Sequence, residues 1–165
     1  MEPQDPLLRA ALTILSEEGP EGLTARRLTA RVGLSTKVVY SRFGGMGGVW
    51  QAVYAHAFGE LNRGLAAGEG LRGAVDAYRS FAREHSVLFD LLYGPDILRH
   101  LPGRRDREIA VSGLATVAAY LDGDMERARE VWTRMHGIVA LERSDWLDAE
   151  EAESRLAALV REFES

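Results

Sequence analysis

Apolar residues recur every three or four positions along most of this chain, and no long segment alternates apolar and polar residues. The first spacing is typical of helices that bury one face, and alternation is typical of strands. The pattern therefore predicts an all-α protein of about nine helices without a sheet. Besides two short helices discussed next, we expect helices from Asp5-Pro6 to Gly19, from Met46 or Val49 to about residue 65, and over residues 71–84, 87–93, 97–101, 105–121, 125–142 and 149–163.

Residues 23–43 (LTARRLTARVGLSTKVVYSRF) are predicted to form two short helices joined by a tight turn at Gly33. Such a pair is a helix-turn-helix, whose second helix enters the major groove of DNA. We expect Thr24 and Ser35 to cap the two helices. The positions expected to face inward are Leu28, Val32, Val39 and Phe43. We expect residues 1–48 to form a three-helix DNA-binding domain, and residues 49–165 to form a separate helical bundle.

The charge distribution favours the same interpretation. Residues 23–43 carry five basic residues and no acid, and they include Lys37, the only lysine in a chain with a formal net charge of -5. The first fifty residues hold six basic and five acidic residues, whereas the rest hold fourteen basic and twenty acidic. Contact with DNA phosphates requires a local cationic face, not a basic protein. The two halves are therefore expected to have different functions.

The second short helix can be assigned position by position, because helical neighbours repeat every three or four residues. We expect Lys37 to donate to guanine, Thr36 to bond a base edge or a phosphate, and Val38 to touch a thymine methyl. The amino end of the first helix and the flanks of the second are suited to phosphates. The expected DNA-binding residues are Thr24, Arg26, Ser35, Thr36, Lys37, Val38, Tyr40 and Ser41. The alternative is a solvated basic helix pair with a buried tyrosine.

Aromatic residues are spread through the second half of the chain. Trp132 and His136 lie one helical turn apart and share a face. Gly137, next to them, is expected to mark a close helix crossing with Trp132 and His136 packed around it. The functional interpretation, which is compatible with the first, places Trp132 and His136 on the wall of a ligand pocket. The expected ligand-binding residues are Tyr78, Phe89, Tyr93, Tyr120, Trp132 and His136, with plain core packing as the alternative. Since no cluster of like charge lies among them, we expect a neutral or weakly polar, partly aromatic or acyl ligand.

These residues carry a family resemblance. Residues 5–58 resemble the DNA-binding domain of TetR-family transcriptional regulators, at Gly22, Leu23, Thr24, Leu28, Gly33, Leu34, Ser35, Tyr40 and Phe43. The segment WTRMHGIVALE at residues 132–142 is similar to the Trp-His-Gly signature of one class of TetR ligand-binding domains, and FAREHSVLFDLLYG resembles the central helix of that class. The resemblance implies an all-helical dimer that binds DNA and a small molecule.

One departure from the family pattern concerns DNA contact. The family usually has a lysine at the start of its fourth helix, and this chain has Met46 within the run Gly44-Gly45-Met46-Gly47-Gly48. One expected phosphate contact is therefore missing. Four glycines also lower helix propensity, so the fourth helix is expected to begin late or to fray.

Other function classes find little support in the sequence. The chain has no cysteine, and His56, His85, His100 and His136 lack the spacing of metal ligands. No nucleophile elbow, phosphate loop or dinucleotide fingerprint is present, so an enzyme is the least favoured class. We expect no cofactor and no metal. Neither a leader segment nor an apolar run of membrane-spanning length is evident, so we expect a cytoplasmic protein without a membrane partner.

The sequence therefore predicts a ligand-responsive transcriptional repressor that binds a palindromic DNA operator as a homodimer, with an unknown small-molecule effector. A dimer interface is expected on the last two helices, whose apolar positions exceed what that pair needs. These positions are Val131, Met135, Ile138, Val139, Leu156, Leu159, Val160 and Phe163. The alternative is a helical small-molecule sensor or binding module with weak or lost DNA affinity, which the Met46 departure would allow.

Overall fold

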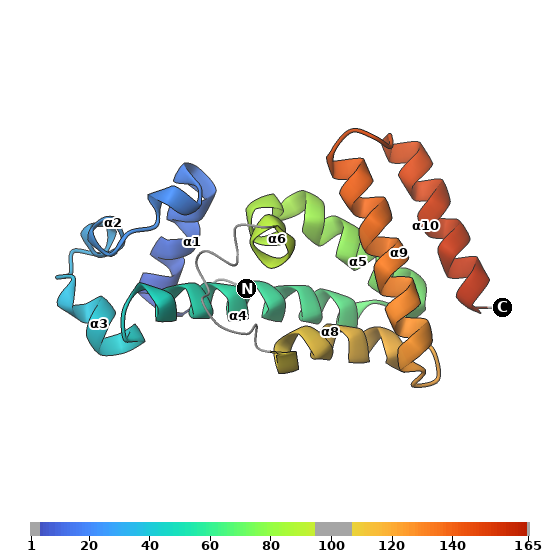
Figure 1. Cartoon of the computed structure of the whole chain (residues 1–165), viewed down its shortest axis with the longest axis horizontal. Helices are drawn as coiled ribbons and strands as arrows, with labels where there is room; N and C mark the ends of the chain where they lie inside the picture. The colour runs from blue at the N-terminus through green and yellow to red at the C-terminus, as the bar shows by residue number, and fades with distance from the viewer. Residues whose placement is uncertain (1–3, 95–106, 165) are drawn as a thin grey trace. The chain divides into compact units, whose positions relative to one another are not determined.

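The computed structural model describes residues 4–94 and 107–164. Within them the chain folds into nine α-helices and one 3-10 turn, without a strand (Figure 1). The elements are α1 (Pro6–Glu18), η1 (Pro20–Gly22), α2 (Ala25–Arg31), α3 (Lys37–Phe43), α4 (Met46–Ala67), α5 (Gly70–Glu84), α6 (Ser86–Tyr93), α8 (Arg107–Ala119), α9 (Met125–Arg143) and α10 (Ala149–Glu164). The all-α prediction is confirmed. The helix expected at residues 97–101 lies outside the described residues.

The chain divides into two compact units. Unit 1 comprises Met1–Phe58 and Val87–Arg105, and unit 2 comprises Gly59–Ser86 and Asp106–Ser165. Helix α4 is shared between them, because its residues through Phe58 belong to unit 1 and the rest to unit 2. Unit 1 thus contains the helix-turn-helix segment and nearly all of α6, and unit 2 contains the end of α4 with α5, α8, α9 and α10.

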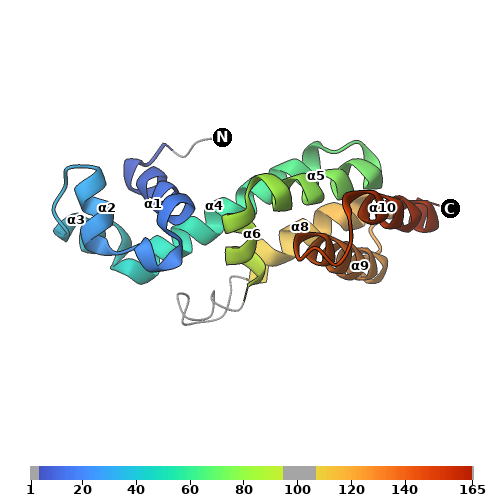
Figure 2. The same ribbon diagram turned by 90° about the horizontal axis from the view of Figure 1, so that it is seen from above.

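Unit 1 is organised around α1, which lies beside α2, and α2 in turn lies beside α3 (Figure 2). Helix α1 begins where the Asp5 carboxylate accepts a hydrogen bond of 2.9 Å from the Leu7 amide, and it ends at Gly19 with φ 71°. The core joins α1, α2, α3, the start of α4 and α6, through Leu7, Ala10, Ala11, Ile14, Leu15, Leu23, Leu28, Val39, Val49, Trp50, Val53 and Leu91. This shared core fixes the two motif helices relative to each other.

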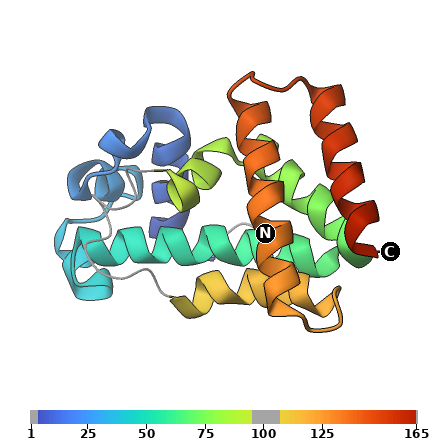
Figure 3. The ribbon, with the colours of Figure 1, turned by 45° about the vertical axis from the view of Figure 1, so that its right-hand side comes forward.

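Unit 2 is built on α9 and α10, which run antiparallel side by side (Figure 3). Asp124 caps α9 by accepting from the amides of Glu126 and Arg127, at 2.9 and 3.0 Å. Asp148 does the same at the start of α10, where it accepts from the amides of Glu150 and Glu151 at 3.0 and 2.8 Å. Two aspartate caps therefore define where this helix pair begins and turns.

The prediction that this pair has surplus apolar residues for a dimer interface is wrong. Seven of the eight named positions are buried within the chain, because α9 and α10 pack against each other and against α5 and α8. They are Val131, Met135, Val139, Leu156, Leu159, Val160 and Phe163. Only Ile138 is half-buried. The sequence pattern identified the apolar positions correctly, but it could not show that α5 and α8 cover them.

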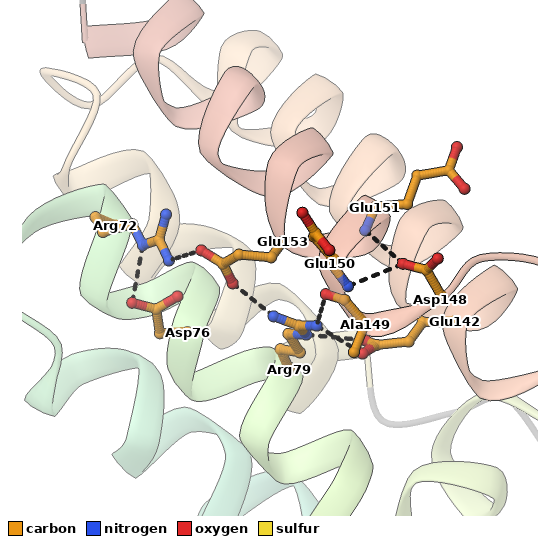
Figure 4. A network of polar contacts seen from close by, with 9 residues as sticks. All are labelled: Arg72, Asp76, Arg79, Glu142, Asp148, Ala149, Glu150, Glu151 and Glu153. Atoms are coloured by element: carbon orange, nitrogen blue, oxygen red, sulfur yellow. Dashed lines mark hydrogen bonds and ion pairs between the residues drawn. The ribbon is translucent and has the colours of Figure 1, made fainter.

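A polar network joins α5 to α9 and α10 (Figure 4). The Arg79 guanidinium donates to the two oxygens of Glu142 on α9 at 2.8 and 2.6 Å, and to Glu153 on α10 at 2.6 Å. It also donates to the Ala149 carbonyl at 2.8 Å. Arg72 links the same Glu153 to Asp76, at 2.5 and 2.9 Å. Arg79 and Glu142 are each 11% exposed, so their bidentate pair is well shielded from water.

Candidate functional site

The helix-turn-helix is formed by α2 and α3. The Thr24 hydroxyl accepts a hydrogen bond of 3.3 Å from the Arg27 amide, which confirms Thr24 as the cap of α2. Gly33 adopts φ 67° in the turn that follows, as the prediction of a turned backbone requires. Leu28 and Val39 are fully buried, whereas Val32 and Phe43 are half-buried against the same core. The motif therefore has the expected inward face.

The expected capping role of Ser35 is wrong. Helix α3 begins at Lys37, and the residue before it, Thr36, has helical backbone angles and makes no side-chain capping bond. The first turn is closed instead by the backbone, because the amides of Val38 and Val39 donate to the carbonyls of Ser35 and Thr36 at 3.0 and 3.1 Å. Such tight turns replace a side-chain cap at many helix starts. Both hydroxyls are exposed, so they are left for other partners.

Most of the expected DNA-binding side chains lie on the surface. Thr24, Arg26, Ser35, Thr36, Lys37, Tyr40 and Ser41 are exposed. Val38 is half-buried and packs against the core of unit 1, so less of its side chain is available to a base. Tyr40 is 64% exposed, and the buried tyrosine of the alternative interpretation is therefore wrong. Leu34 is 45% exposed and was not among the predicted DNA contacts.

The cations of this surface differ in their partners. Arg27 and Arg31 form ion pairs with Glu17 and Glu18 of α1, and Arg42 pairs with Asp5 at 2.8 Å. Among the residues that the structure describes, Arg26 and Lys37 form no ion pair. Of the five cations in residues 23–43, these two therefore have no carboxylate partner within the part of the chain that the structure describes.

The glycine run after α3 has a specific backbone geometry. Gly44 and Gly45 have φ values of 70° and 127°, which glycine adopts without strain. A Cβ on Gly48 would lie 1.8 Å from the Phe43 carbonyl oxygen, so no larger residue fits there. Helix α4 nevertheless begins at Met46, the earlier of the two expected starts. The glycines thus permit a sharp connection between α3 and α4, and the expected late start is not seen.

Three of the six expected ligand-binding residues form one cluster in unit 2. The Tyr78 hydroxyl lies 2.8 Å from His136 Nδ1, and the Tyr78 ring meets the Trp132 ring edge-on with centroids 5.3 Å apart. Tyr78 is fully buried, and Trp132 and His136 are half-buried. Burial lowers the pKa of His136, so its imidazole is neutral at pH 7. The cluster presents aromatic faces and an uncharged imidazole.

The other three lie elsewhere. Phe89 and Tyr93 belong to unit 1, where their rings are 4.9 Å apart. Tyr120 lies in unit 2, but its hydroxyl donates to the carbonyls of Leu65 and Gly68 at the end of α4, at 3.1 and 2.9 Å. Tyr120 therefore has a structural partner of its own. The sequence pattern selected Tyr78, Trp132 and His136, but it could not distinguish them from aromatic residues that have other partners, such as Tyr120.

Gly137 is not a helix-crossing point, contrary to its predicted role. Among the described residues, no atom of another segment lies within 4 Å of the position that a Cβ would take there. The close approach occurs at Gly113 of α8, where a Cβ would lie 2.7 Å from Asn62 Oδ1 and 3.0 Å from Trp132 Cη2. Asn62 also donates through its amide nitrogen to Ser112 at 2.5 Å. Sequence reasoning missed Asn62, Ser112 and Gly113 because they share no motif.

Two family models match the chain. The model for bacterial regulatory proteins of the tetR family matches residues 7–53, and the model for the tetracyclin repressor-like C-terminal domain matches residues 71–163. The chain belongs to the TetR family. It is therefore a TetR-family transcriptional regulator with a DNA-binding domain, in a family whose members are not enzymes and act on DNA as ligand-binding dimers.

Individual proteins show the same similarity. An uncharacterised HTH-type transcriptional regulator of Mycobacterium tuberculosis, Rv0681, is 27% identical over 159 residues, which cover 88% of this chain and 72% of that protein. A solved structure of a Rhodococcus sp. RHA1 protein of unknown function matches with a TM-score of 0.77 and 24% identity, over 95% of this chain and 91% of that one. The multidrug binding protein EbrR, solved with imidazole, matches with a TM-score of 0.68 and 19% identity, over 96% of both chains.

In residues 4–94 and 107–164, no helix is both long enough and apolar enough to cross a membrane. Nor do His, Asp and Glu side chains of the described residues gather in a group of three or more that would hold a metal ion.

Proposed function

We propose that this regulator is a ligand-responsive repressor that binds a palindromic operator as a dimer. The observation that carries the proposal is the exposed face of α3, where Lys37 has no ion pair among the described residues and Thr36, Tyr40 and Ser41 are solvent-accessible. An unpaired cation with hydroxyl groups beside it suits base edges and phosphates together. Residues 1–48 are then the DNA-binding domain, and residues 49–165 bind the effector and the second copy.

The proposed roles follow from exposure and charge. Lys37 donates to guanine in the major groove, with Thr36 beside it. Arg26 and Thr24 bind phosphate at the amino end of α2, and Ser35, Tyr40 and Ser41 do so on the flanks of α3. Val38 contributes only the part of its side chain that the core leaves open.

The dimer surface is proposed on α9, α10 and the turn between them, and Ile138 is the one position retained from the sequence pattern. Leu141 is 45% exposed and Trp146 is 78% exposed, and half-buried Ile138 lies one helical turn before Leu141. A surface patch of large, exposed apolar side chains is typical of a protein–protein interface. We expect a contact of roughly 2,000 Å², as obligate dimers commonly form. Light scattering that finds a monomer at micromolar concentration contradicts this part of the proposal.

The effector site is proposed around Tyr78, Trp132 and His136, in keeping with the Trp-His-Gly class of ligand-binding domain. Their rings and the neutral imidazole favour an uncharged, partly aromatic or acyl ligand. An effector shifts the population of conformers only if it binds them unequally, so its binding must favour a spacing of the two α3 helices that no longer matches successive major grooves, about 34 Å apart. Trp132→Ala is expected to abolish the response to the effector and to spare DNA binding.

A salt-dependent mobility-shift experiment with fragments of the source genome tests the proposal. The wild-type chain is expected to retain a subset of fragments, and a Lys37→Ala/Tyr40→Ala variant is expected to retain none while keeping its helical circular dichroism. The alternative is a helical sensor with lost DNA affinity, favoured by Met46 at the start of α4 where the family usually has lysine. That alternative predicts no shift for either protein. A chromosomal partner implies a cytoplasmic location, which we propose on that ground.

A further inference from the structure

The carboxyl end of α1 lies against the outer face of α2, and the contact is ionic. The Glu18 carboxylate binds both Arg27 and Arg31, with Oε1 3.3 Å from the Arg31 guanidinium. The neighbouring Glu17 carboxylate binds Arg31 as well. The Arg31 hydrogen bond lowers the pKa of Glu17, so that carboxylate is charged at neutral pH. Two carboxylates thus face two of the five cations in residues 23–43.

The position of Glu18 is set by a glycine of the connecting turn. A Cβ on Gly22 would lie 2.5 Å from Glu18 Cβ and 3.3 Å from its Oε2 atom. Because Gly22 has no side chain, the Glu18 side chain can lie over the η1 turn and reach α2. Gly22 is buried, and Glu18 keeps a side-chain exposure of 31%. The carboxylate is therefore held at the junction of α1 and α2 by the shape of the turn.

An arginine that is already paired adds less to DNA binding than a free one. Each phosphate that a free cation neutralises releases condensed counterions, and this release supplies most of the non-specific affinity for DNA. Arg27 and Arg31 must first lose a carboxylate partner, and that partner then stands unpaired beside the phosphates. Arg26, on the same first turn of α2 as Arg27, has no such partner among the described residues.

We propose that Glu17 and Glu18 withhold Arg27 and Arg31 from DNA phosphates, and that this acidic clamp keeps the affinity of the chain for DNA of any sequence low. The inference rests on the proposed function, because it concerns the same DNA-binding surface. A lower non-specific affinity raises the ratio of operator binding to background binding, which is the quantity that matters in a genome. The acidic clamp would thus improve selectivity without touching a base.

The test uses two matched pairs of variants and a random-sequence duplex of about 30 base pairs, roughly three helical turns. Fluorescence anisotropy measures affinity between about 50 and 200 mM salt. Arg26→Gln and Arg27→Gln remove neighbouring cations from one helical turn. We expect Arg26→Gln to weaken binding and to reduce the slope of log affinity against log salt by about two for two bound protomers, at 0.9 per phosphate. Arg27→Gln is expected to leave the slope unchanged.

The second pair removes one carboxylate each. Glu18→Gln is expected to strengthen binding by roughly 2- to 25-fold for two protomers, the range set by the weak energies of exposed ion pairs. Glu21→Gln, an exposed acid of η1 with no ion pair among the described residues, is expected to change affinity by less than about 1.5-fold at the higher salt concentration. In an Arg27→Gln/Arg31→Gln background, Glu18→Gln is expected to have no larger effect than Glu21→Gln.

Equal effects of Arg26→Gln and Arg27→Gln, or equal effects of Glu18→Gln and Glu21→Gln in the wild-type background, overturn the acidic clamp while leaving the proposed function intact. Absence of any binding to DNA by the wild-type chain, in contrast, removes the proposed function and the clamp together. All five substituted side chains are exposed, so the core of unit 1 is unchanged, and circular dichroism checks that each variant is folded.

Discussion

Tyr78 and His136 meet inside unit 2 with the phenol oxygen 2.8 Å from the imidazole Nδ1 atom. Tyr78 is fully buried, and its ring also contacts Trp132 edge-on. A neutral imidazole can accept a hydrogen bond from the phenol hydroxyl at one nitrogen, whereas an imidazolium offers only donors. The direction of this hydrogen bond therefore depends on the protonation state of His136.

The pKa of His136 predicts a pH dependence of stability. Burial lowers that pKa in the folded chain, so the unfolded chain binds more protons as the pH falls below about 6.5, the ordinary value for histidine. The contribution of His136 is therefore constant at higher pH and turns against folding as the pH falls from about 6.5 through the folded-state pKa. Urea unfolding of the wild-type chain and of His136→Gln at pH 7.5 and 5.5 tests this. The wild-type chain is expected to lose more stability between the two pH values, and equal losses refute the assignment.

Gly113 and Gly137 predict opposite effects of the same substitution. Gly113→Ala places a methyl group 2.7 Å from Asn62 Oδ1 and 3.0 Å from Trp132, so we expect a loss of about 1 to 3 kcal/mol in the free energy of unfolding. Gly137→Ala meets no atom within 4 Å and removes a helix-interior glycine, so we expect a gain of up to about 1 kcal/mol. Thermal unfolding of the two variants checks the signs. A stabilised Gly113→Ala contradicts the packing described for α8 and α9.

Removing Arg79 is expected to lower the free energy of unfolding far more than removing Arg129. Arg79→Met leaves Glu142, which is 11% exposed, without its bidentate partner and cuts the links to Glu153 and Ala149. We expect a loss of about 1 to 3 kcal/mol. Arg129→Met breaks only the exposed pair with Glu126, whose side chain is 85% exposed, and is expected to change stability by less than about 0.5 kcal/mol. Chemical unfolding measures both, and similar values would mean that the network adds little.

Lys37 predicts a loss of operator affinity without a loss of stability. The side chain is exposed at the first position of α3 and has no ion pair among the described residues. We expect Lys37→Ala to weaken operator binding by roughly 1 to 3 kcal/mol. Arg63→Ala in unit 2 is the matched control, since it also removes an exposed cation. Binding that Lys37→Ala and Arg63→Ala change equally would move the DNA contact away from α3.

The helices of this fold could be predicted from sequence because their signals are local. Asp5-Pro6 and Gly19 bound α1, and Asp122-Gly123-Asp124 precedes α9 as expected. The capping residue of a helix is harder to predict, because it depends on which hydroxyl reaches a backbone amide. The sequence predicts that Ser35 caps α3, but the backbone closes that turn and the helix starts at Lys37, one residue later than a Ser35 cap would place it.

Residues that act through distant partners could not be found in the same way. Arg79 reaches Glu142 and Glu153 across 63 and 74 positions of sequence, and no spacing rule connects them. Gly113 could not be identified from the sequence either, because no spacing rule connects it with Trp132, the ring that it accommodates. The aromatic pattern selected Tyr78, Trp132 and His136, which the structure brings together, because two of them share a helix face. It also selected Tyr120, whose hydroxyl binds the end of α4.

Selection of DNA fragments from the source genome tests the central claim most directly. Purified wild-type protein is mixed with sheared genomic DNA at physiological salt, and the retained fragments are sequenced, with Lys37→Ala as the parallel control. The account predicts enrichment of one or a few fragments that share an inverted repeat, with half-site centres about one helical turn or a multiple of it apart, and loss of that enrichment for Lys37→Ala. Retained fragments without a common repeat, or the same repeat enriched equally by both proteins, would contradict it.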